Sequence, residues 1–132
     1  MSHHRELVNP PELHPAPGFS HLALAEGGRL VFVAGQVALD QEFNVVGGPD
    51  LGAQARAAME NVKLALEAAG AGWDDVARRT IYTTEPTGYE VITAAIDDVT
   101  GGADHPPQTI VGVTGLAVPG LLIEIEVTAL LA

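Results

Sequence analysis

The chain has 132 residues, 47% of them hydrophobic, which is enough for one domain with a hydrophobic core and too few for two. Its 17 acidic and 6 basic residues give a formal net charge of −11, which argues against binding to nucleic acid or to an anionic membrane surface. The sequence contains no cysteine, no apolar run long enough to cross a bilayer and no apolar N-terminal signal segment, so we expect a cytoplasmic protein.

The N-terminal part of the chain is rich in proline. Residues 1–18 contain four of the nine prolines, and we expect them to form an extended lead-in to a single domain spanning residues 1–132. The next stretch, residues 19–37, has the pattern of a hairpin, with strands at 19–25 and 29–37 on either side of the turn Glu26-Gly27-Gly28.

Two helices are predicted in the middle of the chain. Apolar residues recur at helical spacing over 51–69, with Asp50 as a candidate N-cap and Gly70 at the end. The spacing of threonine and glutamate in residues 87–90 matches a capping box and predicts the start of a second helix there. A strand is expected between the two helices, at 76–85.

The last two strands are expected at 109–116 and 121–131. In the final strand apolar residues alternate with Glu124, Glu126 and Thr128, so one face is apolar and the other polar. The predicted order, β-β-α-β-α-β-β, mixes strands and helices without strict alternation, which is typical of the α+β class.

Two helices are enough to cover one face of such a sheet. The other face would still carry apolar side chains, from Phe32 or Val33, from Ile81 or Tyr82, and from Ile110. Because an apolar face of that size is seldom left in contact with water, we predict a closed homo-oligomer. The alternative is that the N-terminal segment folds across this face.

Four stretches carry a resemblance to a known family. They are VAGQV at 33–37, AQARAAMENVKLALEAAG at 53–70, PPQT at 106–109 and IEIEVTAL at 123–130. Together they resemble the RidA (YjgF) family of reactive intermediate/imine deaminases, from about Asn9 to the C-terminus.

The resemblance implies a fold like that of trimeric chorismate mutase: a mixed β-sheet with two helices on one face. It also implies a homotrimer with a ligand cleft at each subunit interface. Active members hydrolyse 2-imino acids, or their enamine tautomers, to 2-keto acids and ammonia without a metal or organic cofactor. Some relatives are described as endoribonucleases or translation inhibitors, a role that the charge of −11 argues against here.

The chain departs from the family pattern at one position of the implied site. Active members place an arginine just before the penultimate strand, where its guanidinium binds the substrate carboxylate. This chain has Gln108 there, and we expect no neighbouring residue to supply the missing cation. A glutamine amide both donates and accepts, so a neutral carbonyl, amide or imine would suit it. Alternatively, Gln108 only satisfies backbone groups at the start of the strand.

Five further residues match the implied site. Glu124 would orient the attacking water if the protein is active, although it could be a solvated strand carboxylate. Phe19 stands where the family has a tyrosine and would contact the ligand through its ring. Gly35 would let the backbone approach the ligand, or would serve only strand packing. Thr109 and, less securely, Thr93 complete the expected ligand-binding set.

Two hypotheses follow. The first is an atypical, RidA-like homotrimer that binds a small, weakly charged carbonyl- or imine-type metabolite without the usual deaminase activity. The second is an imine or enamine hydrolase of altered specificity. Neither needs a cofactor, and His14, His21 and His105 lack metal-ligand spacing.

Overall fold

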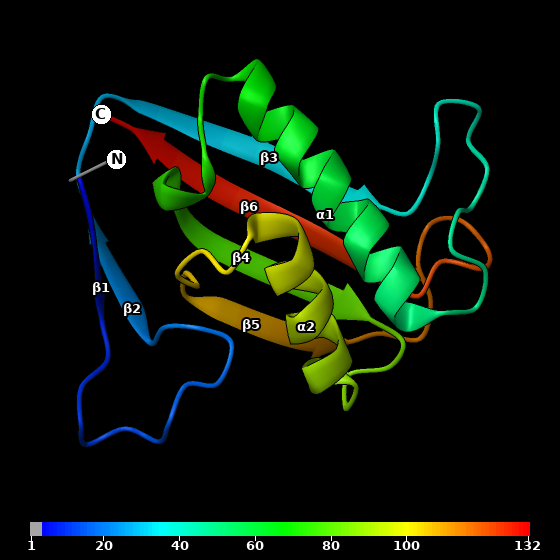
Figure 1. Cartoon of the computed structure of the whole chain (residues 1–132), viewed down its shortest axis with the longest axis horizontal. Helices are drawn as coiled ribbons and strands as arrows, with labels where there is room; N and C mark the ends of the chain where they lie inside the picture. The colour runs from blue at the N-terminus through cyan, green and yellow to red at the C-terminus, as the bar shows by residue number, and fades with distance from the viewer. Residues whose placement is uncertain (1–3) are drawn as a thin grey trace.

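The computed structural model of the chain describes residues 4–132. Its strands and helices run in the following order (Figure 1): β1 (Arg5–Val8), β2 (Leu22–Ala25), β3 (Arg29–Val37), α1 (Leu51–Ala68), the short 3-10 helix η1 (Trp73–Asp75), β4 (Val76–Thr83), α2 (Tyr89–Thr100), β5 (Gln108–Gly112) and β6 (Ile123–Leu131). Both α-helices lie on one face of a mixed sheet, which confirms the predicted α+β fold.

The main sheet has the strand order β3-β6-β4-β5. β6 runs antiparallel to both of its neighbours, whereas β4 and β5 are parallel. Along β6 the predicted alternation holds, because buried Ile123, Ile125, Val127 and Ala129 face the helices. Residues paired across two strands point to the same side of a sheet, so these pairings decide which side chains meet.

The predicted hairpin over residues 19–37 is wrong in its pairing. β2 pairs with β1, inside the segment expected to be a lead-in, and β3 instead pairs with β6. Arg5 anchors β1 to the start of β4 by donating to the carbonyl oxygens of Val76 at 2.7 Å and Trp73 at 3.2 Å. This long-range anchor favours the separate two-stranded sheet over the local hairpin.

The two helices begin differently. The Asp50 side chain accepts a hydrogen bond from the Ala53 amide at 2.9 Å, so the predicted N-cap of α1 is confirmed. At α2 the predicted capping box is wrong, because Gly88 is the N-cap and no side chain caps the helix. A Cβ at residue 88 would stand 2.8 Å from Leu51 Cδ2, so close packing between the helices selects a glycine there.

The face of the sheet opposite the helices, called the open face here, is only partly apolar. Phe32 lies on it with 75% of its surface exposed, and Tyr82 lies on it too, whereas Val33 and Ile81 pack into the core. The prediction for Ile110 is wrong, since it pairs with Ile81 and shares its direction toward the helices.

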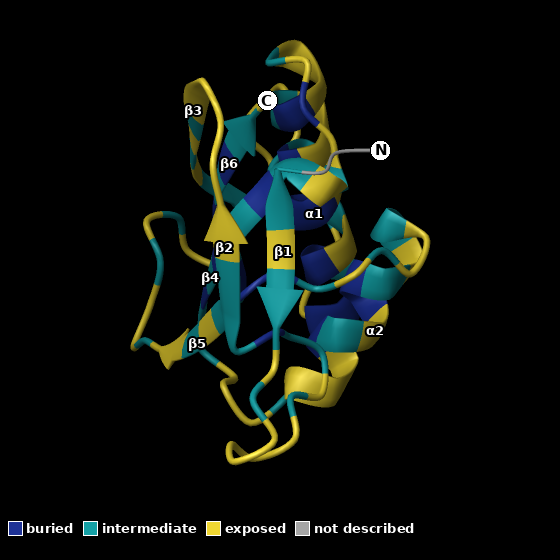
Figure 2. Ribbon diagram, turned by 90° about the vertical axis from the view of Figure 1, so that its left-hand side faces the viewer, coloured by how far each residue is buried: buried dark blue, intermediate teal, exposed yellow. Residues whose placement is uncertain are grey.

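The N-terminal segment does not cover the open face. Figure 2 shows β1 and β2 at the end of the sheet, between the strand layer and the helix layer, so neither strand lies across the open face. The alternative that this segment folds across the face is therefore wrong. Within residues 4–132, no helix combines the length and apolar character needed to span a membrane.

Candidate functional site

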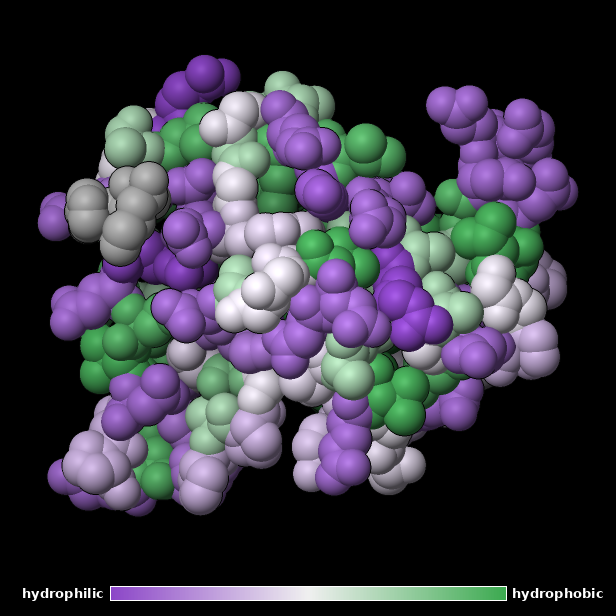
Figure 3. Space-filling model, viewed as in Figure 1, coloured by the Kyte–Doolittle hydropathy of each residue, from purple (hydrophilic) through white to green (hydrophobic). Residues whose placement is uncertain are grey.

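A cleft of about 380 Å³ lies between the N-terminal segment and the β5–α2 edge of the domain. Figure 3 shows it as a hollow at the lower edge of the helix side. Three of the residues predicted to bind ligand, Phe19, Thr93 and Gln108, line it together. The other lining residues are His14, Pro15, Pro17, Pro86, Tyr89 and Ile110.

The chemistry of this cleft is mostly apolar. Among the described residues that line it there is no carboxylate, lysine or arginine, although the whole chain carries a net charge of −11. Rings and prolines make up most of the wall, and the Gln108 amide and the Thr93 hydroxyl provide polar contacts. Such a site suits a small ligand with an apolar body and few polar atoms.

Gly18 fixes the N-terminal wall of the cleft. Its φ of +78° is left-handed, and a Cβ there would stand 2.6 Å from Thr93 Oγ1. The turn directs the next residue, Phe19, toward the rings of His14 and His21, with centroid distances of 6.1 Å and 5.3 Å. Only glycine satisfies both the backbone angle and the close approach to α2.

A cation lies directly beside Gln108, although it does not take the place of the missing guanidinium in the cleft. Arg79 on β4 pairs with Gln108 in the parallel register, and its Nε donates to Gln108 Oε1 at 2.5 Å. Its Nη2 donates to the carbonyl oxygen of Gly18 at 3.1 Å. Arg79 therefore lies behind Gln108 and joins both walls of the cleft, but it does not line the cleft itself.

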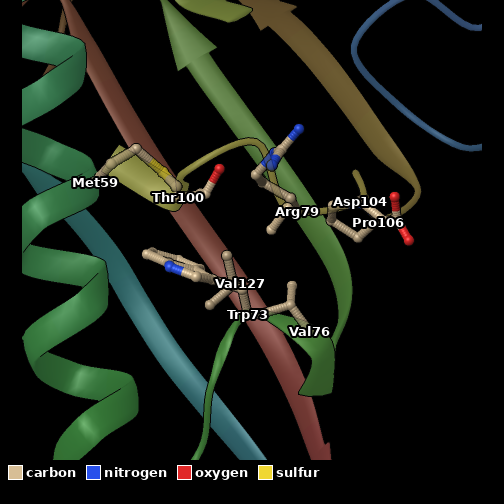
Figure 4. A pocket seen from close by; sticks show the side chains of 9 residues that line it. Met59, Trp73, Val76, Arg79, Thr100, Asp104, Pro106 and Val127 are labelled. Carbon is tan, nitrogen blue, oxygen red and sulfur yellow. The ribbon is translucent and has the colours of Figure 1, made fainter. Parts of the chain in front are cut away.

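Arg79 is a buried cation, with only 3% of its surface exposed. Figure 4 shows Met59, Trp73, Thr100 and Val127 around a small cavity of about 10 Å³ near its aliphatic part, with the guanidinium directed away from Met59 and Trp73. Burial lowers the pKa of Arg79 to about 10, so the side chain remains charged at neutral pH.

A chain of hydrogen bonds connects Arg79 to α2. Arg79 Nη2 lies 3.0 Å from His105 Nδ1, and His105 Nε2 lies 3.0 Å from Asp97 Oδ1. Because a guanidinium only donates, His105 Nδ1 must accept, so His105 is neutral with its proton on Nε2. Burial and the adjacent Arg79 charge both lower the pKa of His105, which agrees with the neutral form.

Glu124 and Gly35, two further residues of the predicted site, lie together on the open face. A Cβ at Gly35 would stand 2.0 Å from Glu124 Oε2, so this glycine makes room for the Glu124 side chain. The Glu124 carboxylate makes no hydrogen bond or ion pair to another residue within 4–132. By contrast, Glu126 accepts a hydrogen bond from the Tyr82 hydroxyl at 2.7 Å, which raises the pKa of Tyr82.

Thr109 also lies on the open face. Its hydroxyl accepts a hydrogen bond from Arg78 Nη2 at 2.7 Å, and its side chain points away from that of Gln108. Within one chain, then, the predicted site residues separate into a cleft set on the helix side and a second set on the open face. In residues 4–132 no group of three or more histidine, aspartate or glutamate side chains is placed to hold a metal ion.

Sequence reasoning missed four residues that build the cleft, namely Gly18, Arg79, Asp97 and His105. The glycine before Phe19 could have indicated the turn, because a glycine that directly follows a proline is typical of turns. The network of the other three depends on the parallel pairing of β4 with β5, which local patterns do not specify.

Comparison with known proteins agrees with this architecture. The family model described as Endoribonuclease L-PSP matches residues 10–131. A RutC family protein of Synechocystis is 32% identical over 119 residues, 89% of this chain and 90% of the relative. The RutC family protein YjgH of Escherichia coli is 35% identical over 81% of this chain and 79% of its own. The chain belongs to the RidA/YjgF family.

Solved structures of RidA/YjgF family members have the same fold. The crystal structure of the Rid family protein YyfB from Yersinia pestis is 40% identical and superposes with a TM-score of 0.90, covering 97% of this chain and 99% of that one. The YjgF gene product of Escherichia coli is 27% identical, with a TM-score of 0.69 over 80% of this chain and 84% of that one.

Proposed function

We propose that the chain forms a homotrimer that binds a small, weakly charged carbonyl- or imine-type metabolite in the cleft beside Gln108, without the usual 2-imino acid deaminase activity. The observation that carries the proposal is the amide of Gln108 in the wall of the cleft. Where the resemblance implies a guanidinium in active members, this cleft presents an amide within a wall free of formal charge among the described residues.

The buried Arg79 does not replace the missing guanidinium. Its Nε and Nη2 are directed to Gln108, Gly18 and His105, and Arg79 does not line the cleft, so a ligand carboxylate there would meet the amide and not the cation. A hydrogen bond to a charged partner contributes about 1.5–3 kcal/mol, and a neutral one about 0.5–1.5 kcal/mol. The difference weakens binding of an anionic imino acid relative to that of a neutral ligand.

The open face supports the proposed homotrimer. Leu30, Phe32 and Val111 are exposed large apolar side chains there, on strands at both edges of the sheet. A second copy that covers this face would remove them from water and would bring its surface against Glu124 and Gly35. In such an assembly Glu124, Gly35 and Thr109 would lie at the subunit boundaries, and the cleft beside Gln108 would lie on the helix side of the same edge strand, β5.

One observation favours the second hypothesis, an imine or enamine hydrolase of altered specificity. Glu124 is only partly exposed, and its carboxylate has no hydrogen-bond partner among residues 4–132, so it can bind a water molecule. A water held by a carboxylate in a partly desolvated site can attack an imine carbon. We do not propose the nuclease activity named in the family description, because the acidic chain offers no basic stripe for phosphates.

The test is an exchange of residues across the β4–β5 pair. Imines of alanine and leucine are generated in the assay by an amino acid oxidase, and ammonia release is followed with and without the protein. The wild-type protein should add little to spontaneous hydrolysis. The double variant Arg79→Gln/Gln108→Arg keeps the charge but places the guanidinium in the cleft, and at imine concentrations well below saturation it should release ammonia roughly tenfold faster than the wild-type protein.

The single variants Arg79→Gln and Glu124→Ala complete the design. Arg79→Gln alone controls for the loss of the buried cation and should release ammonia no faster than the wild-type protein. Rapid imine breakdown by the wild-type protein that is lost in Glu124→Ala would contradict the binder and support the hydrolase.

A further inference from the structure

We infer that Arg79 is a positioning residue that fixes the direction of the Gln108 amide, so that Gln108 presents its N–H donors to the cleft and recognises a hydrogen-bond acceptor of the ligand. This inference rests on the proposed binding function of the same cleft. It adds a rule for specificity: the ligand atom that meets Gln108 is a carbonyl oxygen, an imine nitrogen or a similar acceptor.

The direction of the amide follows from the chemistry of its partner. A guanidinium has five N–H donors and no acceptor, so the atom of Gln108 that faces Arg79 Nε at 2.5 Å must be the oxygen. The reversed amide would oppose two N–H groups beside a buried cation. The Gln108 oxygen is thus directed to Arg79, and the Nε2 protons remain available to the cleft.

Arg79 in turn has little freedom to move. It is 3% exposed, and its Nη2 is held by the carbonyl of Gly18 and by His105 Nδ1. His105 is held by Asp97 on α2. The loop before β5, the helix α2 and the turn at Gly18 therefore all support the guanidinium that orients Gln108.

Every hydrogen bond in this network has a fixed donor and acceptor. Arg79 donates to Gln108 and to His105, and His105 donates to Asp97, so reversing any one bond would leave an unpaired polar group in a buried site. The Arg79 charge also polarises the Gln108 amide and makes its N–H protons stronger donors. The geometry therefore disfavours a ligand that presents only N–H groups to position 108.

The experiment uses three bicyclic probes of similar size, which suit a cleft lined by rings. 1-Indanone offers a carbonyl acceptor, indole offers an N–H donor, and indene offers neither. Their affinities for the wild-type protein are measured by NMR titration of the resonances of the cleft residues. Expressed relative to indene, 1-indanone should bind roughly tenfold more tightly and indole no more tightly.

Two variants separate positioning from a structural role. In Gln108→Glu, which is isosteric and keeps an oxygen for Arg79, the donor is lost, so 1-indanone should lose its advantage over indene. In Arg79→Gln the amide is free to turn, and indole should gain severalfold relative to indene. The matched control is Arg78→Gln, which removes the same charge from the other face of β4 and should leave both ratios unchanged. A purely structural role for Arg79 would change all three affinities together and leave the ratios constant, which would overturn the inference.

A second measurement tests the orientation without any ligand. In the free wild-type protein the Arg79 Nε–H signal should be protected from solvent exchange, and Gln108→Leu should remove that protection. Fast exchange in the wild-type protein would overturn the inference. If none of the three probes shifts the cleft resonances, the proposed function fails for this cleft. The exchange rate of the Arg79 Nε–H then still decides whether Arg79 holds the Gln108 amide.

Discussion

Arg78 and Arg79 are neighbours in the chain and lie on opposite faces of β4. Arg79 points toward the helices, is almost fully buried and holds Gln108, whereas Arg78 is exposed on the open face and holds Thr109. Strand alternation thus gives two identical residues separate tasks on the two sides of one sheet. The same division separates the six residues that the family resemblance had assigned to one site.

The two faces also differ in how far one chain completes them. On the helix side, the chain closes its own cleft with the turn at Gly18, α2 and β5. On the open face, Phe32 is left 75% exposed and the Glu124 carboxylate has no partner among residues 4–132. The comparison indicates that one chain forms the cleft on the helix side, whereas the open face leaves apolar surface for the second copy that we propose.

The largest effect is expected from a charge placed on the open face. Phe32→Glu would remove an apolar contact worth about 1.5–3 kcal/mol at each interface and would bury a carboxylate in its place. We expect the proposed trimer to dissociate to monomers at micromolar concentration, as measured by analytical ultracentrifugation. Binding of 1-indanone in the cleft of the monomer then shows whether the helix side works alone.

The matched control for this change is Leu64→Glu. Leu64 is an apolar side chain of α1 with 64% of its surface exposed, but it lies in the helix layer and away from the open face. Its substitution should leave the trimer intact. Equal dissociation by both variants, or by neither, would break the distinction between the two faces.

A smaller effect is expected from Gly18→Ala, which tests the helix side. The alanine must adopt a φ near +78° and would bring its Cβ to 2.6 Å from Thr93 Oγ1. Gly70→Ala is the matched control, because its φ of +76° is almost the same and no atom lies within 4 Å of the added Cβ. We expect Gly70→Ala to lower the free energy of unfolding by about 1–2 kcal/mol and Gly18→Ala by about 1–3 kcal/mol more. Urea unfolding measures both, and equal losses would mean that the turn tolerates a side chain beside α2.

Much of the fold followed from local patterns in the sequence. The stripe of α1, its Asp50 cap and the alternation of β6 all depend on residues close together in the chain, and the structure confirms them. The pairing of β2 with β1 did not follow, because β1 lies in the proline-rich segment that was expected to be a lead-in, and its Arg5 is held by the carbonyls of Trp73 and Val76, far along the chain. An alternation of period two indicates that a segment is a strand, but it does not indicate which other strand this one pairs with.

The candidate site was predictable residue by residue but not as an arrangement. The resemblance pointed to Phe19, Thr93 and Gln108, and the structure places them in one cleft. Arg79 remained unnoticed because its role comes from the parallel register that sets it beside Gln108. A buried cation behind a neutral residue has no signature in a linear sequence, where it looks like any strand arginine.

The smallest expected effect is a pH dependence of stability that His105 confers on the helix side. Burial and the Arg79 charge lower the pKa of His105 in the folded state below the value of about 6.5 that it has when unfolded. As the pH falls below 6.5, the unfolded chain therefore binds a proton at His105 before the folded chain does. The contribution of His105 to the free energy of unfolding is fully present above pH 6.5 and falls as the pH is lowered toward the folded-state pKa.

The substitution His105→Gln tests this effect, because glutamine can accept from Arg79 and donate to Asp97 without titrating. Urea unfolding between pH 5 and pH 7.5 should show a shallower loss of stability at low pH in the variant than in the wild-type protein. Protonation of His105 would also set an N–H against the Arg79 guanidinium, so the Arg79 Nε–H signal should lose protection over the same pH range. Parallel stability curves for the two proteins would mean that His105 does not hold Arg79 as a neutral acceptor, and the helix side would then lack the support that distinguishes it from the open face.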